Sequence, residues 1–121
     1  MDMARYTHFL TVALPSGQLQ QQLVNTLQSC NLQIIHTTED YLMARETPSG
    51  IPFAQLVTVE VLIDNTRATE SSTHLSFVVK NEELPLKTNN HCFRMYQLIS
   101  RAFVENKNWS LLEDVAGLQT T

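Results

Sequence analysis

The sequence has few glycines, few basic residues and no long apolar run. Its three glycines stand apart from one another, so they cannot form a glycine-rich phosphate loop. Eight basic residues face twelve acidic ones, and the resulting net charge of -4 repels nucleic acid and anionic lipid surfaces. The apolar stretches fall far short of the roughly twenty residues needed to cross a bilayer. We therefore expect neither nucleic acid nor a membrane among the partners.

Cysteine is also scarce, and this bears on the compartment. Cys30 and Cys92 are separated by about sixty residues, which matches neither a secreted disulfide framework nor a zinc-ligand spacing. The segment from Met1 to Arg5 lacks the basic region and apolar run of a signal peptide. We therefore expect a reduced, cytoplasmic location.

Length and composition indicate one packed domain. The chain has 121 residues, of which 43% are hydrophobic and 17% charged. A domain of this size buries roughly two-thirds of its unfolded surface without needing a disulfide or a metal. We expect a single domain over residues 1–121, with an ordered core at about 5–105 and a C-terminal strap at 106–118.

Segments rich in β-branched and aromatic residues predict five strands. The clearest lies before Asp64, where three valines and an isoleucine alternate with mostly polar residues, so that one face is buried and the other is largely polar. The predicted strands, in chain order, are Tyr6–Leu14, Leu32–Thr37, Tyr41–Thr47, Val57–Asp64 and His74–Lys80.

The first of two predicted helices follows the first strand. Leu19, Leu23 and Leu27 recur at four-residue spacing among polar residues, which is typical of an amphipathic helix. Ser16 offers a side-chain oxygen for its N-cap, and the apolar pattern stops near Cys30.

The second predicted helix starts at the segment Asn89-Asn90-His91-Cys92. From His91 onward, apolar residues fall at three- and four-residue steps, which predicts a long one-sided helix capped by Asn89 or Asn90. Beyond Asn106 the chain is expected to form a further short helix or a strap, anchored by Trp109.

The predicted fold class is therefore α+β. The order β-α-β4-α gives a curved antiparallel sheet with two helices packed on one face, because each helix shows one apolar stripe and the sheet one apolar face. This order, over about residues 6–105, resembles the TATA-binding-protein-like and helix-grip folds, a resemblance that implies architecture alone. The segment Lys80–Cys92, KNEELPLKTNNHC, resembles small uncharacterised cyanobacterial proteins, which implies no activity.

Cys92 is the one candidate for thiol chemistry. A thiol in the first turn of a helix feels the positive end of the helix dipole, which favours the thiolate. Adjacent helical residues diverge by about 100°, so His91 and Cys92 cannot by themselves form a nucleophile and base pair. Cys92 also lies on the apolar stripe with Tyr96 and Ile99. The structural alternative is a capped helix with Cys92 as a small buried hydrophobe.

The remaining titratable residues predict no catalytic or metal site. His8, His36, His74 and His91 lack the close spacing of metal ligands, and no elbow motif with a Ser-His-Asp order occurs. We expect no metal, no cofactor and no enzymatic activity.

The first functional hypothesis is a non-enzymatic interaction or regulatory module. Glu60, Leu62, His74 and Val78 lie on the polar face of the two central strands, where apolar Leu62 and Val78 suggest a surface for a protein partner or a second copy. Glu60 and Lys80 are expected to form a cross-strand pair there.

The alternative hypothesis is a pocket for a small hydrophobic ligand. It would lie between the sheet and the long helix, lined by Val59, Phe77, Tyr96 and Phe103, as helix-grip folds allow. A domain of this size can also fill such a space with its own side chains.

Overall fold

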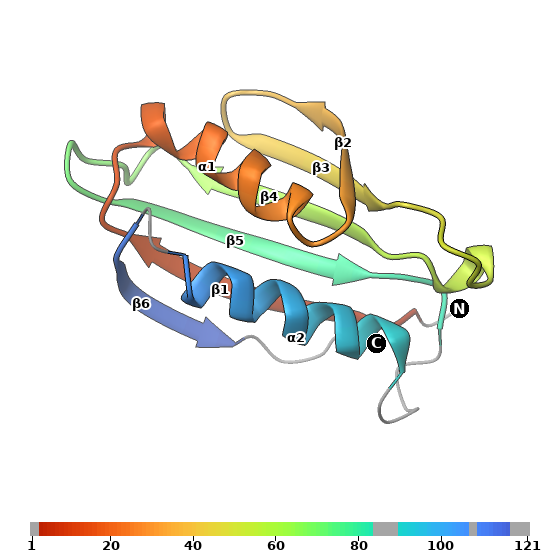
Figure 1. Cartoon of the computed structure of the whole chain (residues 1–121). Coiled ribbons are helices and arrows are strands. Elements are labelled where there is room, and N and C mark those ends of the chain that lie inside the picture. Colours follow the sequence, from red (N-terminus) through yellow and green to blue (C-terminus); the bar gives the residue numbers. More distant parts are fainter. Residues whose placement is uncertain (1–2, 84–89, 107–108, 117–121) are drawn as a thin grey trace.

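A six-stranded sheet carrying two helices makes up the described part of the chain (Figure 1). The computed structural model describes residues 3–83, 90–106 and 109–116, with Ser16, Glu113 and Ala116 described by their backbone alone. The elements are β1 (Arg5–Val12), α1 (Ser16–Gln28), β2 (Leu32–Thr37), β3 (Tyr41–Glu46), the 3-10 turn η1 (Phe53–Gln55), β4 (Thr58–Asp64), β5 (Thr73–Lys80), α2 (His91–Val104) and β6 (Leu111–Ala116).

The sheet is antiparallel throughout, with the strand order β2-β3-β4-β5-β1-β6. The α+β class and the antiparallel sheet are confirmed. The predicted element order β-α-β4-α is incomplete, because β6 follows α2 and pairs with β1. The pairing register shifts between Thr11 and Val12, and this irregularity breaks the alternation of apolar residues by which β6 could have been recognised. Residues 107, 108, 117 and 118 of the predicted strap lie outside the described residues.

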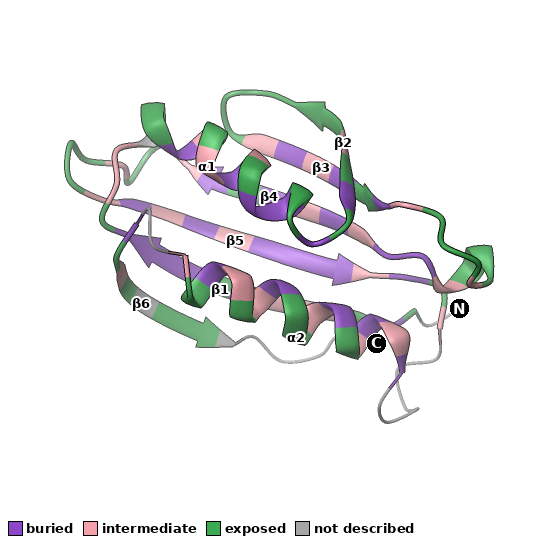
Figure 2. Ribbon diagram, viewed as in Figure 1, coloured by how far each residue is buried: buried purple, intermediate pink, exposed green. Residues whose placement is uncertain are grey.

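Both helices lie over the same face of the sheet (Figure 1). In α1, Leu19, Leu23 and Leu27 are fully buried, as their spacing predicts. The stripe of α2 is buried as well, and α2 packs over β1 and β5. Figure 2 shows the buried residues along β4 and β5 beneath the helices, whereas β6 is largely exposed. The predicted capping role of Ser16 is wrong, because Ser16 is already helical and Pro15, in extended conformation, holds the N-cap position.

Strict alternation along the strands separates two faces of the sheet. Along β4, Val59 and Val61 point toward the helices and are fully buried, whereas Leu62 on the opposite face is 53% exposed. We call the face without helices the open face. Its side chains come from alternate residues of β1, β3, β4 and β5, together with Val115 of β6.

The start of α2 is fixed by two side chains. The Asn90 side chain accepts a hydrogen bond from the Phe93 N–H at 2.7 Å, which confirms Asn90 as the N-cap, while Asn89 lies outside the described residues. The Glu83 carboxylate accepts the N–H groups of Cys92 at 2.9 Å and His91 at 3.3 Å. A negative charge at this position also interacts favourably with the helix dipole. The sequence alone gives no sign of this contact, because Glu83 lies in a loop before the helix that it reaches.

Glu83 should make the stability of the protein depend on pH. Burial opposes its charge, but hydrogen bonds from Asn81 and from the backbone of Cys92 and His91 outweigh this and lower the pKa of Glu83. A lowered pKa in the folded state contributes stability that is present above the unfolded pKa of about 4.3 and is lost as the pH falls through the folded pKa.

We therefore expect Glu83→Gln to lower the free energy of unfolding at pH 7 by about 1 to 3 kcal/mol, as for hydrogen bonds to charged groups. The difference in the free energy of unfolding between this variant and the unmodified chain should shrink as the pH falls from 5 to 3. Urea unfolding at several pH values measures this difference. Glu82→Gln, at the exposed neighbouring position, is the matched control and should have little effect. An equal loss in the free energy of unfolding at pH 7 and at pH 3 would contradict this role of Glu83.

Candidate functional site

The four interaction candidates from the sequence all lie on the open face. Glu60 and Leu62 come from β4, and His74 and Val78 from β5. The register pairs Glu60 directly with Val78. Val78 is only 8% exposed, whereas Leu62 is 53% exposed and projects into solvent. The structure therefore brings the four together on one surface, with Leu62 as its exposed apolar member.

An apolar row crosses the middle of the open face. The register aligns Leu62 of β4 with Ser76 of β5, Ser76 with Phe9 of β1, and Phe9 with Val115 of β6. We call these four residues the apolar row. Leu62, Phe9 and Val115 are 53%, 50% and 49% exposed. Three large apolar side chains thus lie in one line, half exposed and without a covering helix.

Sequence reasoning missed two members of the apolar row. Phe9 lies in β1 between His8 and Leu10, and apolar or aromatic residues on both faces of that strand hide its orientation. Val115 was missed because β6 was not recognised. Neither face could be assigned until the strand pairing was known.

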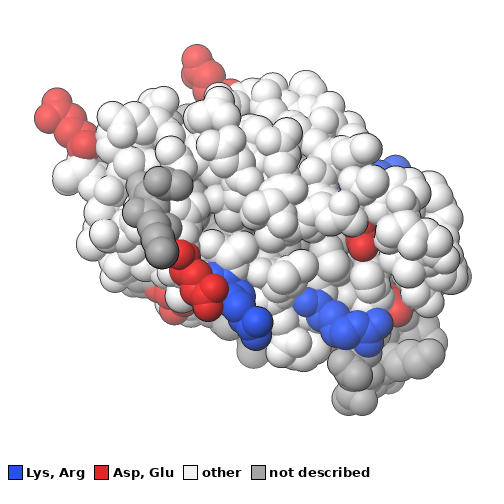
Figure 3. Space-filling model, viewed as in Figure 1, with Lys and Arg blue, Asp and Glu red and all other residues white. Residues whose placement is uncertain are grey.

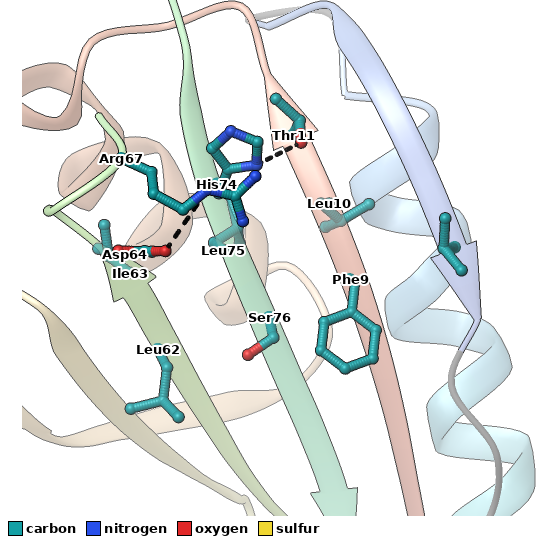
Figure 4. Close-up of a pocket in the computed structure, with 11 residues that line it drawn as sticks. Phe9, Leu10, Thr11, Leu62, Ile63, Asp64, Arg67, His74, Leu75 and Ser76 are labelled. Carbon is teal, nitrogen blue, oxygen red and sulfur yellow. Dashed lines mark hydrogen bonds and ion pairs between the residues drawn. The ribbon is translucent and has the colours of Figure 1, made fainter. Parts of the chain in front are cut away.

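A groove of about 480 Å³ lies along one side of the apolar row (Figure 4). Phe9 and Leu62 project from the sheet on either side of Ser76, and the helices lie behind the sheet in this view. At the polar end of the groove, the Thr11 hydroxyl and His74 Nδ1 are 2.9 Å apart. Arg67 lies over His74 and approaches Asp64 at 4.0 Å. The groove thus joins an apolar floor to a polar end.

Charged side chains on the open face are held in a defined network around Glu60. Lys80 Nζ lies 2.5 Å from Glu60 Oε1, which confirms the expected cross-strand pair. The Tyr41 hydroxyl donates to Glu60 Oε2 at 2.7 Å. The hydrogen bonds from Lys80 and Tyr41 lower the pKa of Glu60 despite its partial burial. The hydrogen bond to Glu60, with burial and the Glu60 charge, raises the pKa of Tyr41 to about 12. Both groups keep one charge state across the physiological range.

The four residues proposed to line a ligand pocket pack against the core between the sheet and α2. Val59, Phe77 and Phe103 have no exposed surface. The rings of Phe77 and Phe103 lie 4.7 Å apart, and those of Phe77 and Tyr96 lie 6.2 Å apart. Their own side chains occupy the space that a ligand would need. A ligand at this place stays a prediction, without support from the packing.

The histidines do not converge on a metal site. His8 and His74 belong to neighbouring strands, but His8 faces the helices and His74 the open face. His8 is 7% exposed, and both of its ring nitrogens are hydrogen-bonded, one to the Tyr96 hydroxyl at 3.0 Å and the other to Asp114. His8 therefore ties β1 to α2 and β6. Within the described ranges, no three His, Cys, Asp or Glu residues are grouped to hold a metal ion.

His91 and Cys92 point to different partners. His91 Nε2 lies 2.8 Å from Glu46 Oε1, and Glu46 is 4% exposed. Cys92 is fully buried, with its Sγ 3.4 Å from the Val79 carbonyl oxygen. Burial, with the charges of Glu83 and Glu46, raises the pKa of the Cys92 thiol to about 12. Desolvation therefore outweighs the helix dipole, and the thiol is the dominant form at neutral pH.

Comparison with known proteins finds no matching family model, no matching curated protein and no matching solved structure. The resemblances to helix-grip folds and to small cyanobacterial proteins therefore stay predictions. None of the described helices is long and apolar enough to span a membrane. Function has to be inferred from the site itself.

The burial of Cys92 predicts slow thiol chemistry. Because the thiol is protonated and inaccessible, iodoacetamide at pH 7.5 should modify Cys92 at least tenfold more slowly in the native chain than in 6 M urea. Mass spectrometry of digested samples over time measures the modification at Cys92 and Cys30 separately. Fast modification of the native chain that disappears in Cys92→Ser would contradict this prediction and support thiol chemistry at Cys92.

Proposed function

We propose that this chain is a non-enzymatic interaction module that binds a protein partner through its open face. The observation that carries this proposal is the apolar row, in which Leu62, Phe9 and Val115 are each about half exposed on a sheet face without helices. Burying these three side chains against a partner would remove apolar surface from water, the main source of favourable free energy in association.

The size of the open face supports a macromolecular partner. The five strands that form the open face, spaced about 4.8 Å apart and about seven residues long, give an area of roughly 500 Å². A typical stable interface buries about 800 Å² on each partner, so this face supplies most of one interface. The exposed apolar centre within a polar surround also matches the usual composition of interfaces.

The titratable groups support a role without catalysis. His8 has both ring nitrogens engaged, Cys92 is protonated and buried, and Glu60 is held in its charged form by Lys80 and Tyr41. His8 and Cys92 are buried, and Glu60 is engaged by two partners, so none of these three groups is placed as an accessible general acid or base. The two cysteines are free thiols, which supports the proposed cytoplasmic location.

The proposal is tested by comparing the full chain with an open-face variant in affinity capture from the native organism. Phe9→Ser/Leu62→Ser removes two of the three large apolar side chains of the apolar row, whereas Leu98→Ser removes a 46% exposed leucine from α2 on the other side. We expect the unmodified chain and Leu98→Ser to capture the same proteins. The double variant should capture at least tenfold smaller amounts of these proteins, as measured by quantitative mass spectrometry.

Equal retention by all three chains would contradict a role for the open face. Circular dichroism and urea unfolding check that the double variant is folded, which is expected because both substitutions are at exposed positions. Light scattering over a range of concentrations detects self-association, and its loss in the double variant would identify the partner as a second copy.

A further inference from the structure

A second row of side chains, parallel to the apolar row, carries positive charge. The register aligns Arg45 of β3 with Thr58 of β4, Thr58 with Lys80 of β5, and Lys80 with Arg5 of β1. We call these four residues the basic row. It lies on the open face, because its members alternate with buried residues along their strands.

The basic row contains two guanidinium groups, those of Arg5 and Arg45. Lys80 is paired with Glu60, but no ion pair to Arg5 or Arg45 occurs within the described residues. Arg45 instead lies over the ring of Phe53, with its Cζ 4.9 Å from the ring centroid, and Phe53 is 67% exposed. Both arginines are exposed. The charge of Arg5 also helps to lower the pKa of Glu60. Both guanidinium groups keep exposed N–H donors that a partner can reach.

The open face differs in charge from the chain as a whole. Among the described residues, this face carries four of the chain's eight basic residues, namely Arg5, Arg45, Arg67 and Lys80. The described carboxylates on it are Glu60 and Asp64, and Glu113 shares the face by its backbone register. On the helix side, basic groups gather over α2 and acidic groups lie around it (Figure 3). A protein with a net charge of -4 thus presents a locally positive open face.

The spacing of the two rows is within reach of one short segment. Each row, from Leu62 to Val115 or from Arg45 to Arg5, spans three strand spacings, or about 14 Å. Phe9 and Arg5 are four residues apart in β1, so the rows are separated by about 13 Å along the strands. Apolar and acidic side chains of one peptide can therefore contact both rows at once.

We infer that the partner reaches this face with an acidic polypeptide segment whose apolar side chains cover the apolar row and whose carboxylates contact Arg5 and Arg45. This inference rests on the proposed function and names the chemistry of the partner. Carboxylates pair well with guanidinium groups through two parallel hydrogen bonds. The apolar row supplies affinity, and the two arginines supply orientation and selectivity.

Charge and shape favour a polypeptide over a nucleic acid as the occupant. A short acidic segment senses mainly the charges within a Debye length, about 8 Å in physiological salt, so it meets the basic row with little repulsion from the rest of the chain. A long polyphosphate backbone would instead meet the surrounding acidic surface. Leu62 and Val115 are aliphatic, and Phe9 is the one aromatic ring of the apolar row, so the row lacks the succession of rings on which bases stack.

The test uses a displayed library of random twelve-residue peptides selected against the immobilised full chain. Enriched peptides should combine several Asp or Glu residues with apolar ones. Fluorescence anisotropy of the best peptide should show at least tenfold weaker binding to Arg5→Glu/Arg45→Glu and to Leu62→Ser. Arg101→Glu, at an exposed position on α2, is the matched control and should bind as the unmodified chain does. Binding should weaken as salt rises from 50 to 300 mM.

Several results would overturn the inference, and they separate it from the proposed function. Neutral or basic peptides that need Leu62 but not Arg5 and Arg45 would keep the open face as a binding surface and remove the acidic partner. If no peptide is enriched, the inference of an acidic partner is also contradicted. The capture experiment then still tests the open face as a binding surface. Tighter arginine-dependent binding of a twelve-residue oligothymidine, or dimerisation lost in Leu62→Ser, would replace the acidic segment with a nucleic acid or a second copy.

Discussion

Packing of both helices against one face of the sheet is the constraint on which the rest of this structure depends. The ring of Phe77 lies at the centre of this contact, 4.7 Å from the ring of Phe103 and stacked on His8 at 5.3 Å. Because α1 and α2 are committed to this face, they cannot cover the other one. The alternation of the strands then leaves Phe9, Leu62 and Val115 half exposed on the open face. The candidate site is thus a consequence of how the core is filled.

The same packing bears on the other functional hypotheses. Because side chains fill the space around Phe77, the residues proposed to line a ligand pocket pack directly against one another. Burying Cys92 at the start of α2 removes the thiolate that a helix dipole would otherwise favour, and Glu83 takes the dipole interaction instead. Polar groups near α2 therefore stabilise the position of the helix. The exposed apolar row lies on the open face, away from these groups.

Much of the fold could be predicted from the sequence, because the relevant signals are local. The alternation in β4 and the leucine spacing in α1 follow from the geometry of a strand and a helix. A cap at Asn89 or Asn90 could be predicted from the place of these residues before an apolar stripe, and the structure identifies Asn90. By contrast, β6 contains a register shift that breaks its pattern, and its pairing with β1 connects distant parts of the chain. Composition could not reveal that pairing.

The candidate site was predicted only in part for a similar reason. Leu62 and Glu60 could be placed on one face because β4 alternates clearly, but Phe9, Val115, Arg5 and Arg45 join them only through the strand order β3-β4-β5-β1-β6. The global charge of -4 also concealed a locally positive surface, since charge distribution depends on which faces the strands present.

Site-specific photo-crosslinking in living cells tests the central claim most directly. A photoreactive phenylalanine analogue is placed at Leu62 on the open face or at Leu98 on α2, and covalent products are compared after illumination. The account predicts a discrete heavier product from position 62 and none from position 98. A product from position 98 with none from position 62 would contradict the assignment of the open face as the interaction surface.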